Sequence, residues 1–140
     1  MSKWHREYLE QARFISRRSK DPRKQVGAVV TEDNYIVGEG FNGFPRGVAD
    51  EPHRLNDKRL KNLLMLHAES NALWLANGRG DTIYVYPCLP CTQCLGLIIR
   101  QSIKRIVVPT IDLTRETSWN QGVVINLCEE VGIEIVEVEL

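Results

Sequence analysis

Hydrophobic residues recur at helical spacing near the start of the chain. Trp4, Tyr8, Ala12 and Ile15 lie three or four residues apart, as on one face of a helix over residues 3–18. The polar stretch SRRSKDP then ends this pattern with a proline. The segment therefore predicts an amphipathic helix that covers a sheet.

The pattern then changes to two short β-rich runs, QVGAVV and YIVGEGF, with TEDN between them. Asp and Asn at this position are typical of a tight turn, so the chain from Gln25 to Phe41 predicts an antiparallel hairpin. The Gly- and Pro-rich stretch NGFPRGVADEPH predicts a loop. After it, the leucines at 60, 63, 64 and 66 indicate one helix, and HAESNALWLANG indicates a second that ends at Asn77-Gly78.

From residue 82 onward, strands and helices alternate. The predicted strands are TIYVY, RIVVP and IEIVEV, and the predicted helices between them cover residues 92–100 and 119–131. Strands joined by crossover helices run parallel and connect with a right-handed turn. The whole chain, residues 1–140, is therefore predicted to be one α/β domain with three layers, α/β/α. It has a five-stranded mixed sheet, helices on both faces and an antiparallel edge hairpin.

Composition narrows the class of partner. The 140 residues include 18 Lys plus Arg and 18 Asp plus Glu, so no excess of positive charge indicates nucleic acid, and a small ligand is the better expectation. The charged N-terminus and the lack of 18 consecutive apolar residues argue against a signal peptide and a membrane span. We expect a cytoplasmic protein, in which clustered thiols serve as metal ligands or catalytic groups rather than in disulfides.

The stretch YPCLPCTQC contains two overlapping C-x-x-C pairs, formed by Cys88, Cys91 and Cys94. A C-x-x-C pair alone fits a structural zinc site or a redox pair as well as a catalytic site. A lone His67 at a predicted helix start is more often a capping or packing residue. The combination is more specific, because His67-x-Glu69 at one predicted helix start and Pro-Cys-x-x-Cys at the next is the signature of zinc deaminases.

Zinc accepts mixed imidazole and thiolate ligands, and three protein ligands with one open position is the catalytic arrangement. His67, Cys91 and Cys94 are the predicted Zn²⁺ ligands. Glu69 is the predicted proton carrier, since a carboxylate beside an activated water can take its proton and return it to a leaving group. Residues two apart do not share a helix face, so His67 and Glu69 can reach one site only around the end of their helix.

The stretches SKDPRKQVGAVV, GEGFNGFPRG, HAESNAL, TIYV and PCTQCLGLIIRQSIKRIVV carry a resemblance that covers roughly Ser19 to Val108. The chain resembles the cytidine and deoxycytidylate deaminase superfamily, and more narrowly the deoxycytidylate (dCMP) deaminases. The resemblance implies a cytidine deaminase-like fold, zinc on His67, Cys91 and Cys94, proton transfer by Glu69, and substrate contact by Asn42. It also implies homo-oligomers, hexamers or dimers, and regulation by effectors such as dCTP and dTTP.

The chain departs from the family pattern at three places. TIYV and Pro90-Cys91 are one residue further apart than usual, which predicts a bulge or shifted loop at Pro87-Cys88. Cys91 and Cys94 follow a proline and precede a helical pattern, so they are the expected ligand pair. Cys88 is then a packed, unligated thiol, as is Cys128. Leu66 and the stretch VADEPHRLNDK also differ from relatives, and the latter leaves regulation an open question.

For dCMP, zinc chemistry at C4 of cytosine would release ammonia and leave dUMP. The Ala68 N–H is a candidate donor to the base O2, and the Leu89 or Pro90 carbonyl a candidate acceptor from the exocyclic amine. A 5′-phosphate requires nearby donors. The basic residues beside the family-specific stretches are Lys20, Arg23, Lys24 and Arg46, of which Arg46 is the first choice and Lys24 the second.

Trp119 or Phe44 could stack on the base, although an aromatic residue at such a position more often serves core or interface packing. Two alternatives stay open on the sequence alone. One is a deaminase of a related nucleoside, base or tRNA adenosine. The other is a non-catalytic, zinc-stabilised nucleotide-binding module, for which Glu69 would be needless.

Overall fold

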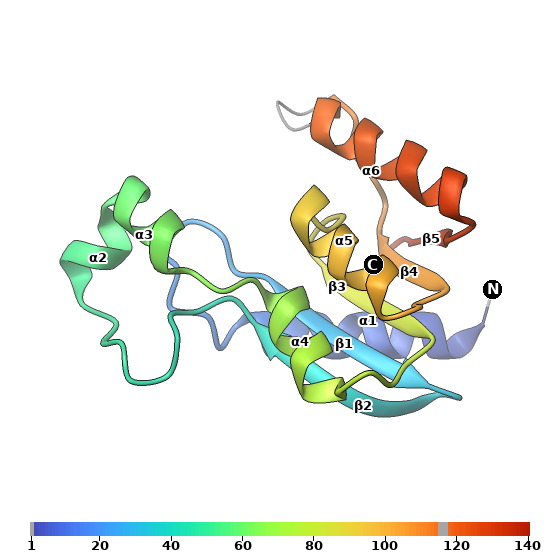
Figure 1. The fold of residues 1–140 in the computed structure, drawn as a ribbon, viewed down its shortest axis with the longest axis horizontal. Helices are drawn as coiled ribbons and strands as arrows, with labels where there is room; N and C mark the ends of the chain where they lie inside the picture. Colours follow the sequence, from blue (N-terminus) through green and yellow to red (C-terminus); the bar gives the residue numbers. More distant parts are fainter. Residues whose placement is uncertain (1, 115–117) are drawn as a thin grey trace.

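A central five-stranded sheet organises the molecule (Figure 1), which is described here from a computed structural model. The structure describes residues 2–114 and 118–140. Its helices are α1 (Lys3–Ser16), α2 (Pro52–Asn56), α3 (Lys58–Leu64), α4 (Ala68–Ala76), α5 (Thr92–Arg100) and α6 (Ser118–Val131). Its strands are β1 (Gly27–Glu32), β2 (Tyr35–Phe41), β3 (Thr82–Tyr86), β4 (Arg105–Pro109) and β5 (Glu134–Val138).

The strand order is β2-β1-β3-β4-β5. β1 pairs antiparallel with both β2 and β3, whereas β3, β4 and β5 run parallel to one another. The β1–β2 hairpin lies at one edge, and the crossover helices α5 and α6 join the parallel strands. The predicted mixed sheet with an antiparallel edge hairpin is confirmed.

Helices cover both faces of this sheet, as the sequence predicts. Helix α1 packs on one face through Leu9, Ala12 and Ile15, which are fully buried against strand residues such as Val29 and Val107. Helices α4, α5 and α6 cover the opposite face and form the larger core (Figure 1). The alternation of strand side chains between two faces thus supplies both cores.

Two glycines allow α4 to lie unusually close to the edge strand. A Cβ atom at Gly38 would lie 2.2 Å from the carbonyl oxygen of Ala72, and one at Gly40 would lie 2.7 Å from the Ala72 nitrogen. Backbone atoms of a packed helix move less readily than the end of a flexible side chain, so a larger residue at either position on β2 would force α4 to shift. This close packing fixes α4, and therefore its first residues, relative to the sheet.

The structure corrects several predicted boundaries. The first helix ends at Ser16 rather than at residue 18, a difference of the size usual for fraying helix ends. The stretch predicted as loop, residues 42–53, ends inside the short helix α2, which begins with Pro52, a residue suited to the first helical position. Helix α3 ends at Leu64, so Leu66 lies outside it and instead forms a β-bridge with Gly43.

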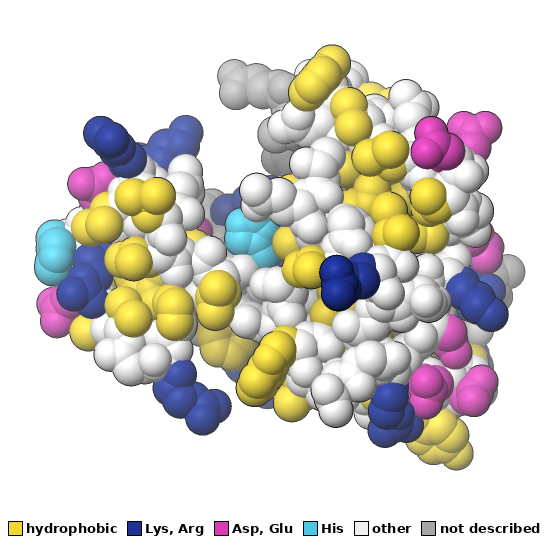
Figure 2. Space-filling model, viewed as in Figure 1, with side chains coloured by type: hydrophobic (Ala, Val, Ile, Leu, Met, Phe, Trp, Pro, Cys, Tyr) yellow, Lys and Arg dark blue, Asp and Glu magenta, His cyan; other side chains and the backbone are white. Residues whose placement is uncertain are grey.

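Helices α2 and α3 lie apart from the sheet and its covering helices (Figure 1). They belong to a lobe whose base is closed by the Gly43–Leu66 bridge, with hydrogen bonds of 3.1 and 2.8 Å between the two backbones. The surface is hollowed between this lobe and the main body (Figure 2). No helix in the described residues has the length and apolar character needed to cross a membrane.

Candidate metal centre

Two helix starts converge at the predicted metal site. His67 is the N-cap of α4, with an extended backbone (φ −79°, ψ 151°), and Glu69 lies in the first turn of that helix. Cys91 is the N-cap of α5, and Cys94 lies in its first turn. His67 and Glu69 thus lie at the first turn of α4. This is the place where side chains two residues apart were predicted to reach one site.

The three predicted ligands come together although they lie on two separate elements. His67 Nδ1 is 3.4 Å from the Sγ of Cys91 and 3.4 Å from the Sγ of Cys94. All three ligand atoms lie within 4.8 Å of one another, and no fourth Cys, His or carboxylate among the described residues belongs to this group.

This donor set fits zinc. A tetrahedral zinc ion with bonds of about 2.3 Å to sulfur and about 2.0 Å to nitrogen needs sulfur–nitrogen separations of roughly 3.5 Å. The two observed distances of 3.4 Å agree with this requirement. Three ligands leave a fourth position open for water or substrate, which is the arrangement of catalytic zinc sites.

The electrostatics of the cluster also suit a cation. Hydrogen bonds from the Cys94 thiol and from His67 lower the pKa of Cys91 to about 3, and the Cys94 N–H at the helix start adds to this effect. The bond to Cys91, together with burial, raises the pKa of Cys94. The same neighbour, Cys91, raises the pKa of His67. These contacts favour the thiolate form of Cys91, which is the form that binds a metal ion.

Glu69 is buried beside this cluster, with 5% of its surface exposed. Burial raises the pKa of its carboxyl above the ordinary value, because a charged carboxylate is poorly solvated there. A carboxyl with a raised pKa can hold and release a proton nearer to neutral pH. It is not part of the ligand group and is free to act on a bound molecule.

These groups open into a cavity of about 370 Å³, a size that accepts a small ligand. His67, Ala68 and Glu69 line it together with Leu89, Pro90 and Cys91. One wall is the turn around Asp21 and Lys24 with Asn42, a second is the end of α3, and a third is the start of α6 at Asn120 and Gln121. The cavity thus gathers segments from five parts of the chain.

Several of the predicted substrate-binding residues line this cavity, namely Asn42, Ala68, Leu89, Pro90 and Lys24. Arg46 does not line it. That side chain is exposed in the loop after β2. Phe44, Lys20 and Trp119 are also absent from its lining, and Trp119 is 76% exposed. The structure therefore ranks Lys24 above Arg46 for contact with a ligand in this cavity.

The side-chain amide of Asn42 is engaged with neighbouring backbone. Its Oδ1 accepts the Val26 N–H at 2.8 Å, and its Nδ2 donates to the Lys24 carbonyl at 2.9 Å. Asn42 is 6% exposed. Its hydrogen bonds support the loop before β1, and the residue also lines the cavity.

The sequence reasoning did not assign Asp21, Lys61, Asn62, Met65, Asn120 or Gln121, all of which line the cavity. The quoted D-P-x-x-Q-V-G-A stretch contains Asp21, and an Asp that precedes a tight turn was a usable signal for a backbone-capping role. The residues on α3 and α6 carried no such signal, because their position depends on how distant segments pack.

A second, wider cavity of about 860 Å³ adjoins the first. Both are lined by Lys24, Cys88 and Gln121. Arg13, Arg17 and Arg23 also line the second cavity, and no carboxylate appears among its described lining residues. The second cavity, called the cationic hollow below, therefore lies next to the cavity of the metal centre. It concentrates positive charge in a chain whose formal net charge is zero.

Cys88 lies at the junction of these cavities and is half-buried, so it is a wall residue rather than a fully packed thiol. It is not part of the ligand group, as predicted. Cys128 is 1% exposed within the larger core, which confirms its predicted packing. The β1–β3 register is unbroken up to Tyr86, and Pro87 and Cys88 form a loop after a cis Tyr86–Pro87 peptide bond. A loop thus follows the strand at these residues, and no bulge interrupts the β1–β3 register.

Comparisons with known proteins agree with this site. The profile of the cytidine and deoxycytidylate deaminase zinc-binding region matches residues 2–110. An uncharacterized deaminase in the luxG 3′ region of Aliivibrio fischeri is 34% identical over 139 residues, which are 96% of this chain and 93% of that protein. Human deoxycytidylate deaminase is 40% identical over 111 residues, which are 72% of this chain and 62% of the human protein.

The fold itself has a solved counterpart. The structure of dCMP deaminase from the cyanophage S-TIM5 in complex with dCMP and dUMP matches with a TM-score of 0.75. The match covers 99% of each chain at 22% sequence identity. This chain spans 56% and 62% of the length of the Caenorhabditis elegans and human relatives.

Proposed function

The chain belongs to the cytidine and deoxycytidylate deaminase family, and from this premise we propose that it deaminates dCMP hydrolytically to dUMP and ammonia. The observation that carries the proposal is the His67, Cys91 and Cys94 cluster beside a buried Glu69, in a cavity that adjoins a cationic hollow. The cluster and Glu69 supply the chemistry of deamination, and the hollow supplies recognition of a phosphate.

His67, Cys91 and Cys94 would hold the zinc ion, which when bound lowers the pKa of a coordinated water to about 7. Glu69 takes a proton from the attacking water and gives it to ring N3 of cytosine. It then takes the remaining proton from the oxygen now bonded to C4 and transfers it to the amino group, which leaves C4 as ammonia. Its raised pKa supports this role, because the same carboxyl must accept and donate protons in one cycle.

The cavity also offers groups that can orient a pyrimidine base. Ala68 lies at the first position of α4, where backbone N–H groups have no partner within the helix, and we assign its N–H to the base O2. The carbonyl of Leu89 or Pro90 accepts from the exocyclic amine in this proposal. Asn42, which also lines the cavity, contacts the substrate in this proposal, with its amide orientation fixed by Val26 and Lys24.

A phosphate on the substrate would lie toward Lys24, which lines both cavities. Arg23 lines the cationic hollow together with Lys24 and is a further candidate donor to the phosphate. Arg46 remains a proposed contact of lower rank, because it lies outside both linings. Charge-assisted hydrogen bonds to phosphate are roughly twice as strong as neutral ones, which favours a nucleotide over a nucleoside.

Four wider proposals accompany this one. We place the protein in the cytoplasm and in pyrimidine deoxynucleotide metabolism, and we keep dCTP and dTTP as candidate effectors. We also propose a homo-oligomer, a dimer or hexamer. Support comes from exposed apolar residues on α4 and α5, where Trp74 is 82% and Leu97 is 45% exposed and both line one shallow hollow. Hydrophobic side chains also gather over α5 and α6 in Figure 2.

An ammonia-release assay tests the proposed function against its alternatives. Zinc-loaded protein is incubated with dCMP, deoxycytidine, cytosine, and a tRNA whose adenosine could be deaminated. Release from dCMP at the highest kcat/KM supports the proposal. Preference for another substrate would retain the deaminase chemistry and replace the substrate. Nucleotide binding without release from any of them would favour the non-catalytic module.

A further inference from the structure

One buried ion pair joins the lobe of α2 and α3 to the loop before β1. Lys61 Nζ lies 2.9 Å from Asp21 Oδ1, and each residue is 7% exposed. In the other four ion pairs of the described residues, every side chain is between 33% and 63% exposed. This pair is therefore shielded from solvent in a way that the surface pairs are not.

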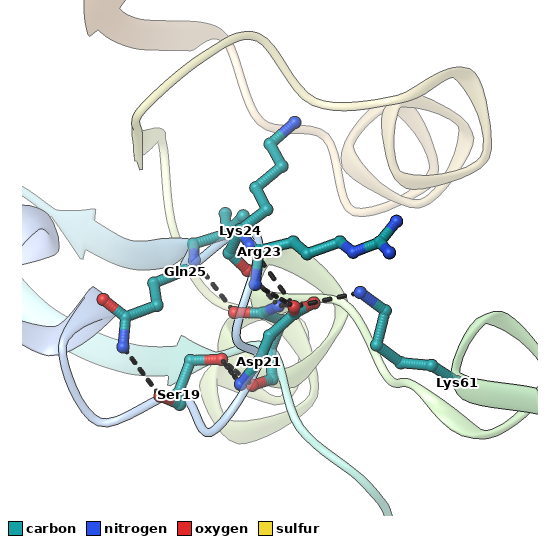
Figure 3. A network of polar contacts seen from close by, with 8 residues as sticks. Ser19, Asp21, Arg23, Lys24, Gln25 and Lys61 are labelled. Atoms are coloured by element: carbon teal, nitrogen blue, oxygen red, sulfur yellow. Dashed lines mark hydrogen bonds and ion pairs between the residues drawn. The ribbon is translucent and has the colours of Figure 1, made fainter. Parts of the chain in front are cut away.

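The oxygen that Lys61 contacts also shapes the turn that carries Lys24. Asp21 Oδ1 accepts the backbone N–H of Arg23 at 2.8 Å and that of Lys24 at 3.3 Å, while Lys61 approaches it from α3 (Figure 3). Burial alone would raise the pKa of Asp21, but the Arg23 N–H and the Lys61 ammonium outweigh it, and the pKa lies below its ordinary value. A charged carboxylate thus connects α3 directly to the turn.

Other side-chain contacts of the lobe stay local. Within residues 2–114 and 118–140, Arg54 and Asp57 bond to backbone groups of the lobe itself, whereas Lys61 reaches Asp21 in the turn before β1. The Gly43–Leu66 bridge closes the base, and Lys61 lies on the cavity wall with Asn62 and Met65.

We propose that Lys61 and Asp21 form a latch that holds the α2–α3 lobe (residues 44–64) against the turn at residues 21–24. The latch sets both the position of one cavity wall and the direction of Lys24, and so determines substrate affinity. Both are positioning residues, because they act on the substrate through the wall and through Lys24. The effect on substrate affinity rests on the proposed function. The latch itself consists only of residues of this chain.

The energetics of buried pairs favour a positioning role over a stabilising one. Desolvation of two charges offsets much of their attraction, so a buried pair contributes little net stability compared with apolar residues of similar volume. Removal of one partner, in contrast, leaves an unpaired buried charge and is strongly destabilising. A polar contact at this place is better explained by the fixed geometry that it imposes on the lobe and the turn.

The test compares Lys61→Met with Lys58→Met, an exposed lysine on the same helix. Lys61→Met should raise KM for dCMP roughly tenfold with little change in kcat and full zinc content, because misplaced binding groups weaken binding more than chemistry. Limited proteolysis should cleave residues 44–64 faster in Lys61→Met than in wild type. Lys58→Met should match wild type in both measurements.

A second variant covers the case in which Lys61→Met fails to fold because Asp21 is left charged and unpaired. The double variant Asp21→Asn with Lys61→Met has no such charge and should fold, lose the latch and show the same raised KM and faster cleavage. Wild-type KM and wild-type cleavage in either folded variant would overturn the latch. Proteolysis reports on the latch even if wild-type protein deaminates no substrate, so failure of the two proposals can be told apart.

Discussion

Asn42 Nδ2 lies 2.9 Å from the carbonyl oxygen of Lys24, and thus a residue at the end of β2 fixes the backbone of the residue assigned to the phosphate. The same nitrogen is 3.5 Å from Asp21 Oδ2. The amide group therefore faces two acceptors with its donor end, while its oxygen accepts the Val26 N–H. An isosteric carboxylate could make only the last of these contacts.

We expect Asn42→Asp to destabilise the fold by roughly 1–3 kcal/mol at neutral pH, because it removes a donor from a buried acceptor and adds a negative charge beside Asp21. Urea denaturation measures the change. The loss should shrink as pH is lowered and the carboxyl groups are protonated. Asn126→Asp, on an exposed position of α6, is the matched control and should be neutral. Equal stability of both variants would contradict the bracing role.

The cysteine assignment predicts different zinc contents for three single variants. Cys91→Ser and Cys94→Ser should lose zinc and activity, because a hydroxyl is a poor replacement for a thiolate ligand. Cys88→Ser should keep both, since Cys88 lies outside the group of ligand atoms. Metal analysis of the purified variants decides the matter. Loss of zinc in the Cys88 variant alone would reverse the choice between the overlapping pairs.

Glu69→Gln should retain zinc and lower turnover by roughly 10² to 10⁴, the usual contribution of a positioned acid or base. The amide keeps the size of the side chain in its buried place but cannot carry the proton. The measurement pairs zinc content with the rate of ammonia release from dCMP. Glu130→Gln, on an exposed position of α6, serves as control. Normal turnover in the Glu69 variant would remove the proton-carrier assignment.

The sequence predicted the sheet, its edge hairpin and the metal ligands, because each of these depends on short-range signals. Strand alternation, turn residues and two local motifs at helix starts were enough to place His67 and Cys91 together. It did not predict α2 or the buried ion pair of Lys61 with Asp21. The stretch around α2 buries none of its residues and therefore has no hydrophobic periodicity. A buried lysine is exceptional, and its partner Asp21 lies 40 residues away.

Lys24→Ala should lower kcat/KM for dCMP by about tenfold or more, since a charge-assisted contact is worth roughly 1.5–3 kcal/mol. It should hardly change kcat/KM for deoxycytidine, which has no phosphate to bind. Wild-type protein should favour dCMP over deoxycytidine at least about a hundredfold if two such contacts form. The fall in cytosine absorbance follows both reactions.

Two further variants define the phosphate contact. Lys20→Ala removes an exposed charge outside both cavities and should leave both substrates unaffected. Arg46→Ala should have a smaller effect than Lys24→Ala. A larger loss in the Arg46 variant would show that its loop reaches the substrate, in agreement with the order that the sequence alone favours. Equal wild-type efficiency on dCMP and deoxycytidine would contradict phosphate recognition altogether.

Gly40→Ala should destabilise the protein by roughly 1–3 kcal/mol, the usual cost of forcing an extra methyl group into a packed interior. The new Cβ would lie 2.7 Å from the Ala72 nitrogen and 2.8 Å from the Ala68 carbonyl oxygen, both in the backbone of α4. Since Ala68 begins the helix that carries Glu69, any shift of α4 should also lower activity in the protein that remains folded.

Gly96→Ala is the control, because it lies within α5 with no atom within 4 Å of its added Cβ. That change should stabilise the helix by about 0.5–1 kcal/mol. Thermal and urea denaturation of both variants, followed by kcat at a temperature where both are folded, distinguishes the two effects. Unchanged stability in Gly40→Ala would mean that α4 can move away from β2 at little cost, and the rigid placement of the metal centre by this contact would be wrong.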